Sequence, residues 1–162
     1  MKKIITAILA ISVLTAMSTT AFAADINQGS TDKSSNTEVT FNVAPTYIVT
    51  IPTAIELTET KTGVITYTGS DTITTSAIRL NKGEKVKIAI ASDFTMTSTK
   101  NATQSYTVTV DGATSSLVNG GEVARFGTNK AAQSVKLNYL AGDPEFAGDY
   151  KDTVTFTLSV VE

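Results

Sequence analysis

Residues 152–160 read Asp-Thr-Val-Thr-Phe-Thr-Leu-Ser-Val, and this stretch decides the fold class of the chain. Its apolar and hydroxyl-bearing side chains alternate: Val154, Phe156, Leu158 and Val160 against Thr155, Thr157 and Ser159. Successive side chains of a β-strand point to opposite faces. The period of two therefore predicts a strand with one buried face and one wetted face.

The same alternation recurs along the 162-residue chain. Besides 152–160, it predicts strands over residues 38–43, 47–51, 64–68, 72–78, 85–91, 105–110, 122–126 and 133–139. Gly, Asn and Asp separate many of these segments and favour tight turns. A helical turn is expected only near residues 129–133. About eight or nine short strands of this kind predict an all-β fold, an antiparallel Greek-key, immunoglobulin-like β-sandwich.

The first residues have the pattern of a bacterial secretory signal peptide. Lys2 and Lys3 precede a mostly apolar run over residues 4–17, and Ala21-Phe22-Ala23 supplies the small residues of a cleavage site. The apolar run is shorter than the roughly 20 residues that a membrane-spanning helix needs. We therefore expect export, with no membrane association after cleavage.

Cleavage after Ala23 divides the chain into three parts. We expect a signal peptide at 1–23, a flexible polar leader at 24–37 and a single β-sandwich domain at 38–162. The exported part keeps 11 basic residues against 15 acidic ones, so its net charge is −4. A mildly acidic surface disfavours binding to nucleic acid and to anionic lipid.

The chain contains no Cys, no His and no Trp. Disulfides, the usual zinc sites, the Ser-His-Asp triad and the Cys-His dyad are thereby excluded. No other pair of residues stands out as a nucleophile with its base. The sequence therefore predicts a non-enzymatic protein with no catalytic residue and no cofactor.

An acidic cluster before the last strand is the best candidate for a metal site. It consists of Asp143, Glu145, Asp149 and Asp152. Carboxylate oxygens suit calcium, but the spacing matches no EF-hand loop. A solvated turn is the simpler interpretation, so no metal ligand is predicted and calcium stays an open alternative.

The segment 38–43 places Val39, Phe41 and Val43 on one face of a strand. This strand could be donated to a neighbouring subunit, with the three side chains filling apolar pockets and the main chain adding hydrogen bonds. The alternative is that the segment forms the first strand of its own domain. Strand donation would make the chain its own partner.

Two short segments carry a family resemblance. Residues 147–160 join a Gly148-Asp149-Tyr150 turn to a Thr-alternating strand, and residues 47–52 read Tyr-Ile-Val-Thr-Ile-Pro. Both are similar to segments of short secreted β-sandwich surface proteins of Gram-positive bacteria, including the WxL-type proteins. Phe156 replaces the Trp of that pattern. The resemblance implies a cell-surface location and a role in binding peptidoglycan.

The sequence as a whole predicts a secreted, cell-surface structural or adhesin-type protein, such as a fimbrial or pilus-like subunit. Its expected partners are further copies of itself or other surface proteins. The alternative is an extracellular module that binds cell-wall or host glycan. Carbohydrate sites commonly use exposed aromatic side chains, and without Trp only five Tyr residues are available for that role.

Overall fold

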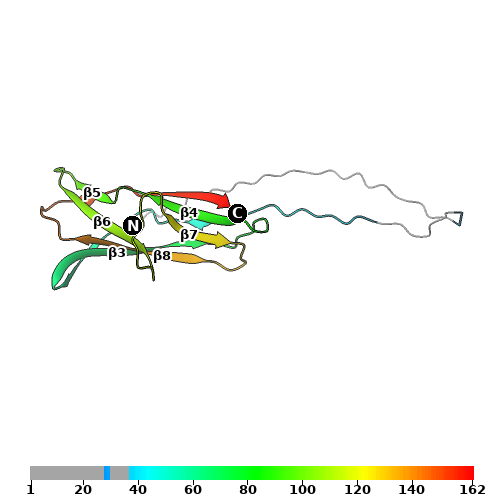
Figure 1. Cartoon of the computed structure of the whole chain (residues 1–162), viewed down its shortest axis with the longest axis horizontal. Helices are drawn as coiled ribbons and strands as arrows, with labels where there is room; N and C mark the ends of the chain where they lie inside the picture. Colours follow the sequence, from blue (N-terminus) through cyan, green and yellow to red (C-terminus); the bar gives the residue numbers. More distant parts are fainter. Residues whose placement is uncertain (1–27, 30–36) are drawn as a thin grey trace, which may run out of the picture.

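The computed structural model describes residues 28–29 and 37–162, and the described part forms two antiparallel β-sheets with an extended segment on its N-terminal side (Figure 1). The predicted signal peptide (1–23) and nearly all of the predicted leader lie outside the described residues. The all-β, antiparallel prediction is confirmed, because every regular element in the described part is a strand.

Ten strands are present in the described residues. They are β1 (Val49–Thr50), β2 (Thr58–Thr62), β3 (Val64–Thr75), β4 (Lys85–Ala91), β5 (Thr95–Ser98), β6 (Thr103–Val110), β7 (Glu122–Gly127), β8 (Ser134–Gly142), β9 (Tyr150–Lys151) and β10 (Thr155–Val161).

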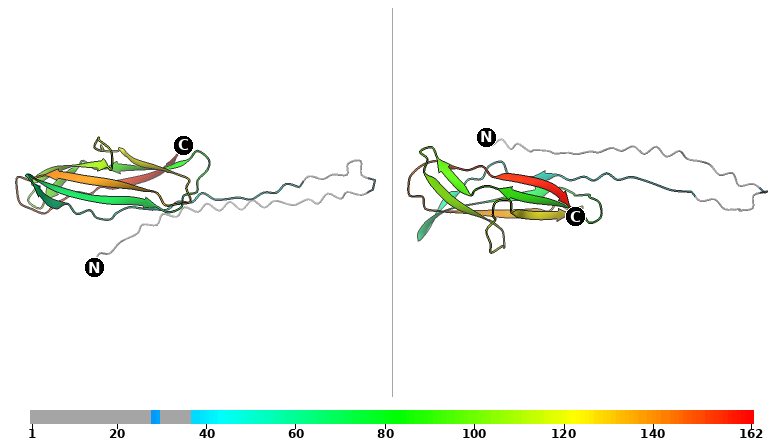
Figure 2. Two further views of the ribbon diagram at one scale, coloured as in Figure 1. Left: turned by 90° about the horizontal axis from the view of Figure 1, so that it is seen from below. Right: turned by 45° about the horizontal axis from the view of Figure 1, so that its top comes forward.

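The larger sheet has the order β1-β3-β8-β6-β5-β9, with β2 paired to the first half of β3. The smaller sheet has the order β10-β4-β7. Neighbours such as β3, β8 and β6 are not consecutive in the sequence, because the chain crosses repeatedly from one sheet to the other. The two sheets lie as layers along the same long axis (Figure 2).

One apolar core lies between the sheets. Its fully buried members come from both of them: Ile73, Val108 and Leu137 from the larger sheet and Val86, Ile88 and Ile90 from the smaller one. Along β4 the buried residues occupy every second position, as the period-two pattern predicts. Burial of these branched side chains is the main source of stability that a chain without disulfides can draw on.

Several strands have the predicted bounds, and others do not. β4 covers the predicted residues 85–91, whereas the two segments predicted at 64–68 and 72–78 form one continuous strand, β3. The prediction of a first strand at 38–43 is wrong, because these residues are extended but paired with nothing within the described chain. The predicted helical turn at 129–133 is also absent, since Asn129 forms a β-bridge with Ile78.

Gly69, near the middle of β3, allows another part of the chain to cross close above it. A Cβ atom at this position would lie 2.7 Å from Leu57 Cδ2 and 2.9 Å from the Glu56 carbonyl oxygen. The crossing segment, Pro52 to Leu57, connects β1 to β2. Gly69 is therefore required by the close approach of backbone to backbone, and it fixes the path of this segment.

We predict that Gly69→Ala lowers the free energy of unfolding by about 1–3 kcal/mol, because the Glu56 backbone cannot move aside as a flexible side chain would. Urea denaturation measures the change. Gly127→Ala is the matched control, since a Cβ there would meet nothing within 4 Å. Equal stability of the two variants would contradict the close-approach argument.

Candidate functional site: an open groove beside the last strand

β10 lies at the end of the smaller sheet, and within the described residues it is paired on one side only, with β4. Its inward-facing residues lie directly opposite fully buried residues of β4, in the pairs Phe156–Ile90, Leu158–Ile88 and Val160–Val86. The β10 members are covered far less well. Phe156 and Leu158 are half-buried, and Val160 keeps 44% of its surface exposed. The core is thus closed on the β4 side and open on the β10 side.

A groove of about 1020 Å³ extends beside the start of β10. One wall is the crossing segment Pro52 to Leu57, and the other is the stretch from Lys151 to Phe156. Aromatic side chains also line it: Tyr67, Tyr106 and Tyr139 of the larger sheet. The groove has a mixed apolar and polar lining and reaches β10 at Phe156, so it adjoins the free edge of that strand. A groove beside a free strand edge can accept an extended peptide.

The tyrosines in the groove are held by ring contacts. Tyr106 and Tyr139 are stacked, with ring centroids 6.5 Å apart, and Phe94 meets Tyr106 edge-on at 5.8 Å. Tyr139 keeps only 4% of its surface exposed. Its hydroxyl has no hydrogen-bond partner among the described residues. Burial raises the pKa of Tyr139 to about 12, so the hydroxyl stays protonated and available as a donor.

Asp152 ties three parts of the chain together at the edge of the groove. Its Oδ2 accepts hydrogen bonds from the hydroxyls of Ser92 and Tyr106, each at 2.6 Å. Its Oδ1 accepts the backbone N–H of Thr153 at 2.6 Å. Burial acts to raise the pKa of Asp152, but these bonds to the carboxylate outweigh it and lower that pKa. For Tyr106, burial and the Asp152 carboxylate together raise the pKa well above its ordinary value.

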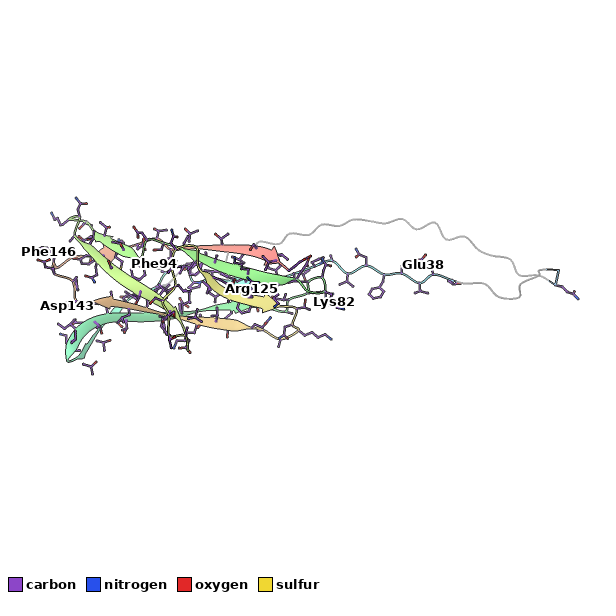
Figure 3. All side chains as sticks on the ribbon, viewed as in Figure 1. Glu38, Lys82, Phe94, Arg125, Asp143 and Phe146 are labelled. Carbon is purple, nitrogen blue, oxygen red and sulfur yellow. The ribbon has the colours of Figure 1, made fainter. Side chains whose placement is uncertain are left out.

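The three predicted strand-donor residues lie far from this groove. Val39 and Phe41 are 87% and 89% exposed, and Val43 is 44% exposed. They belong to the segment 37–45, here called the extension, which leaves the body along its long axis, where Glu38 is labelled in Figure 3. The structure therefore brings the three side chains together on one exposed strand-like segment and leaves them uncovered.

The acidic residues before β10 do not converge on a common point. Among the described residues, no group of three or more Asp and Glu side chains could hold a metal ion. Asp152 is engaged with Ser92 and Tyr106, whereas Asp143, Glu145 and Asp149 belong to the exposed loop between β8 and β9. The calcium alternative therefore has no geometric support in this part of the chain.

The tyrosines do not form a carbohydrate platform. Tyr106 and Tyr139 are buried, and the other three, Tyr47, Tyr67 and Tyr150, are half-buried. Exposed aromatic residues do occur, but they are Phe41 on the extension and Phe146 in the β8–β9 loop. In the part of the chain that the structure describes, no helix is long and apolar enough to cross a membrane.

Sequence reasoning identified the inward face of β10 and the extension but missed the opposite wall of the groove. The segment Pro52 to Leu57 has no period-two pattern, so nothing in it predicted a role. Gly69 lies in the gap between the predicted strands 64–68 and 72–78, and only the continuous strand β3 reveals it as a strand glycine that another backbone approaches closely.

No family model matches the chain, and no curated protein is similar enough to count as a relative. Solved structures do match. A chain of the chaperone–tip adhesin complex of CFA/I fimbriae is similar with a TM-score of 0.53 and 16% identity, and the match covers 72% of this chain and 42% of that one.

A second match is a chain of the CsuC–CsuE chaperone–tip adhesion subunit pre-assembly complex, from the archaic chaperone–usher Csu pili of Acinetobacter baumannii. It has a TM-score of 0.51 and 16% identity over 72% of this chain and 40% of that one. This chain thus spans about two fifths of the chains it matches. At such identity the likeness concerns the fold, and it confirms the immunoglobulin-like prediction.

We predict that Asp152→Asn destabilises the protein at neutral pH, because the carboxylate that accepts three short hydrogen bonds is lost. A carboxyl whose pKa is lowered by folding contributes stability above its unfolded pKa and loses it as the pH falls through the folded value. Thermal unfolding at a series of pH values measures this. The gap in Tm between the wild type and the variant should close below about pH 3.8, the ordinary Asp value. A gap that stays constant to lower pH would contradict the role of the charge.

Proposed function

We propose that this protein is a non-enzymatic, extracellular structural subunit that assembles with copies of itself by strand donation. In this proposal the extension of one copy lies in the groove of another and pairs with the free edge of β10. Val39, Phe41 and Val43 then cover the half-exposed apolar residues of the acceptor. The chain acts as both donor and acceptor, so assembly can continue from copy to copy.

The observation that carries the proposal is a match between two uncovered surfaces of the same chain. The extension presents apolar side chains at every second residue, and the inward face of β10 presents Phe156, Leu158 and Val160 at the same spacing. Side chains on one face of paired strands contact each other across the pair. By pairing with β10, the extension can therefore both hydrogen-bond the free strand edge and cover the apolar side chains on its inward face.

Burial of the donor's apolar side chains would contribute substantially to the free energy of binding. Phe41 is 89% exposed, and full burial of such a side chain is worth about 1.5–3 kcal/mol. The main-chain hydrogen bonds to β10 contribute affinity that does not depend on side chains, while the alternate apolar residues select the segment. Phe41, the largest of the three, is thus the expected anchor.

The similar structures support an assembly role. Both come from complexes in which a chaperone holds a fimbrial or pilus tip subunit. Together with the predicted signal peptide, this supports export and a place in a surface structure of a bacterium. The resemblance to short secreted Gram-positive surface proteins remains part of the proposal, as does retention at the cell surface.

Glycan binding is the second candidate function. A shallow hollow on the larger sheet is lined mainly by hydroxyl and amide side chains: Thr58, Thr68, Ser70, Thr107, Thr109 and Asn138. These groups can hydrogen-bond sugar hydroxyls, but no exposed aromatic residue accompanies them. A glycan array and a peptidoglycan pull-down test this function, and retention of binding in Thr109→Val would contradict it.

We predict that the chain beginning at Ala24 forms polymers and that Phe41→Ser leaves it monomeric, because the donor loses its anchor. Size-exclusion chromatography and electron microscopy measure this. Thr40→Ser is the matched control, since residue 40 points to the other face of the donor strand. The control should polymerise like the wild type.

A synthetic peptide of residues 37–44 provides the second measurement. Added to the Phe41→Ser chain, which can accept but not donate, it should raise Tm in a concentration-dependent manner. The same peptide with Phe41→Ser should have little effect. A wild-type chain that stays monomeric, together with a peptide that leaves Tm unchanged, would contradict strand donation.

A further inference from the structure

Two loops at opposite ends of the body carry opposite charge. The loop between β8 and β9, residues 143–149 and here called the acidic end, contains Asp143, Glu145 and Asp149 and no basic residue. The turn between β3 and β4 contributes the opposite charge, with Arg79, Lys82 and Lys85 all exposed. Figure 3 shows Asp143 and Phe146 at one end of the body and Lys82 at the other.

Acidic residues offset only part of the basic charge at the second end: Glu84 lies in the turn, and Glu162 follows Val161, which is paired with Lys85. Glu84 is the only acidic residue of the turn, and its carboxylate accepts hydrogen bonds from the Asn81 N–H and the Asn81 side-chain amide, each at 3.0 Å. The β-bridge between Ile78 and Asn129 also brings Lys130 to this end. Residues 79–85 with Lys130 are here called the basic end.

The extension is anchored at the basic end. Thr46, directly after the extension, exchanges two backbone hydrogen bonds with Arg79, at 2.7 and 2.8 Å. A copy that donates its extension must therefore bring its basic end close to the point where the inserted strand emerges from the groove. The position of that point on the acceptor decides which surfaces of the two copies meet.

The direction of the donor strand relative to β10 decides where that strand emerges from the acceptor's groove. β10 runs toward the basic end of its own copy (Figure 1). A donor strand antiparallel to β10 would emerge at the acceptor's acidic end, next to the loop 143–149. A parallel donor strand would emerge at the acceptor's basic end and bring two basic surfaces together. Juxtaposed like charges are unfavourable, and opposite charges speed association.

We propose that the loop 143–149 is a docking surface for the basic end of the next copy, so that donation is antiparallel to β10 and the copies stack head to tail. This inference rests on the proposed function and adds its second contact surface. A head-to-tail contact uses two different surfaces of the subunit. Unless the rotation between successive copies closes a ring, such a contact generates an open filament.

The loop has the features of a preformed contact surface. The Tyr150 hydroxyl donates to the Phe146 carbonyl oxygen at 2.7 Å, which holds the loop turned back on itself. Phe146 is 59% exposed and lines the groove. Its ring is therefore available to cover the end of the inserted strand, while the acidic side chains around it meet Arg79 and the lysines of the incoming copy.

Engineered disulfides test the direction, because the native chain has no Cys to interfere. Disulfide formation needs Cα atoms within about 7 Å, whereas the two ends of β10 are about 20 Å apart at ~3.3 Å per residue. The variant A44C/T155C reports an antiparallel donor, and A44C/V161C reports a parallel one. Both are examined on non-reducing gels after assembly of the full exported chain.

We expect a ladder of covalent oligomers from A44C/T155C and none from A44C/V161C. A ladder from A44C/V161C alone would overturn the head-to-tail inference and leave strand donation intact. Monomers without a cross-link in both variants would overturn strand donation itself.

Charge exchange tests the contact between the two ends. E145K/D149K and R79E/K82E should each slow assembly about tenfold at low ionic strength, because each places like charges at the junction. Combining all four substitutions restores the attraction and should return the rate to near that of the wild type. The differences should shrink at high salt. Unchanged rates in the paired variants, or no recovery in the combined variant, would overturn the docking surface.

Discussion

The incomplete cover of β10 is the constraint on which the rest of the structure depends. The smaller sheet ends at a strand that is paired on one side only, and the core beneath this strand is open. Water in contact with half-buried apolar residues costs free energy, and an unpaired strand edge is a template for further pairing. The central strand of this sheet, β4, is paired on both sides, and its inward side chains are fully buried. The molecule therefore has a well-packed core and, at β10, an apolar surface that its described residues leave partly uncovered.

The polar and aromatic contacts around the groove keep this surface open in a defined shape. Asp152 fixes the start of β10 to Ser92 and Tyr106, and the stacked tyrosines hold the adjacent wall. On the other side, the segment above Gly69 is confined by close backbone packing. Walls fixed before binding reduce the ordering cost that an incoming strand must overcome. In the proposed assembly, the groove would accordingly be a preformed acceptor for the donated strand.

The sequence predicted those parts of the fold in which local pattern and burial agree. β4 alternates between Lys or Ala and branched apolar residues, and its bounds were predicted from that alone. β2 was missed because its sequence, Thr-Glu-Thr-Lys-Thr, has no apolar face, and it forms only by pairing with β3. The prediction of a helical turn near residue 129 was wrong, because the long-range β-bridge to Ile78 outweighs the local conformational preference.

Only part of the candidate site was predictable from the sequence. The apolar alternation of residues 39–43 and of β10 is visible in the sequence, since both are local patterns. Their different environments are not visible there: among the described residues, β10 is paired with β4 on one side, whereas the extension is paired on neither side. The wall formed by residues 52–57 depends on contacts between distant segments. Only the three-dimensional arrangement identifies it as part of a groove.

The pair of hydrogen bonds between Thr46 and Arg79 also has a mechanical consequence. In a filament of the proposed kind, tension would enter each subunit through the extension and reach the body at this bridge. Antiparallel hydrogen bonds lie perpendicular to the strands, so a pull along the chain loads them in shear, and both must break together. The short strand β1 behind the bridge adds further bonds in the same orientation. The subunit would thus resist stretching where the extension joins its body.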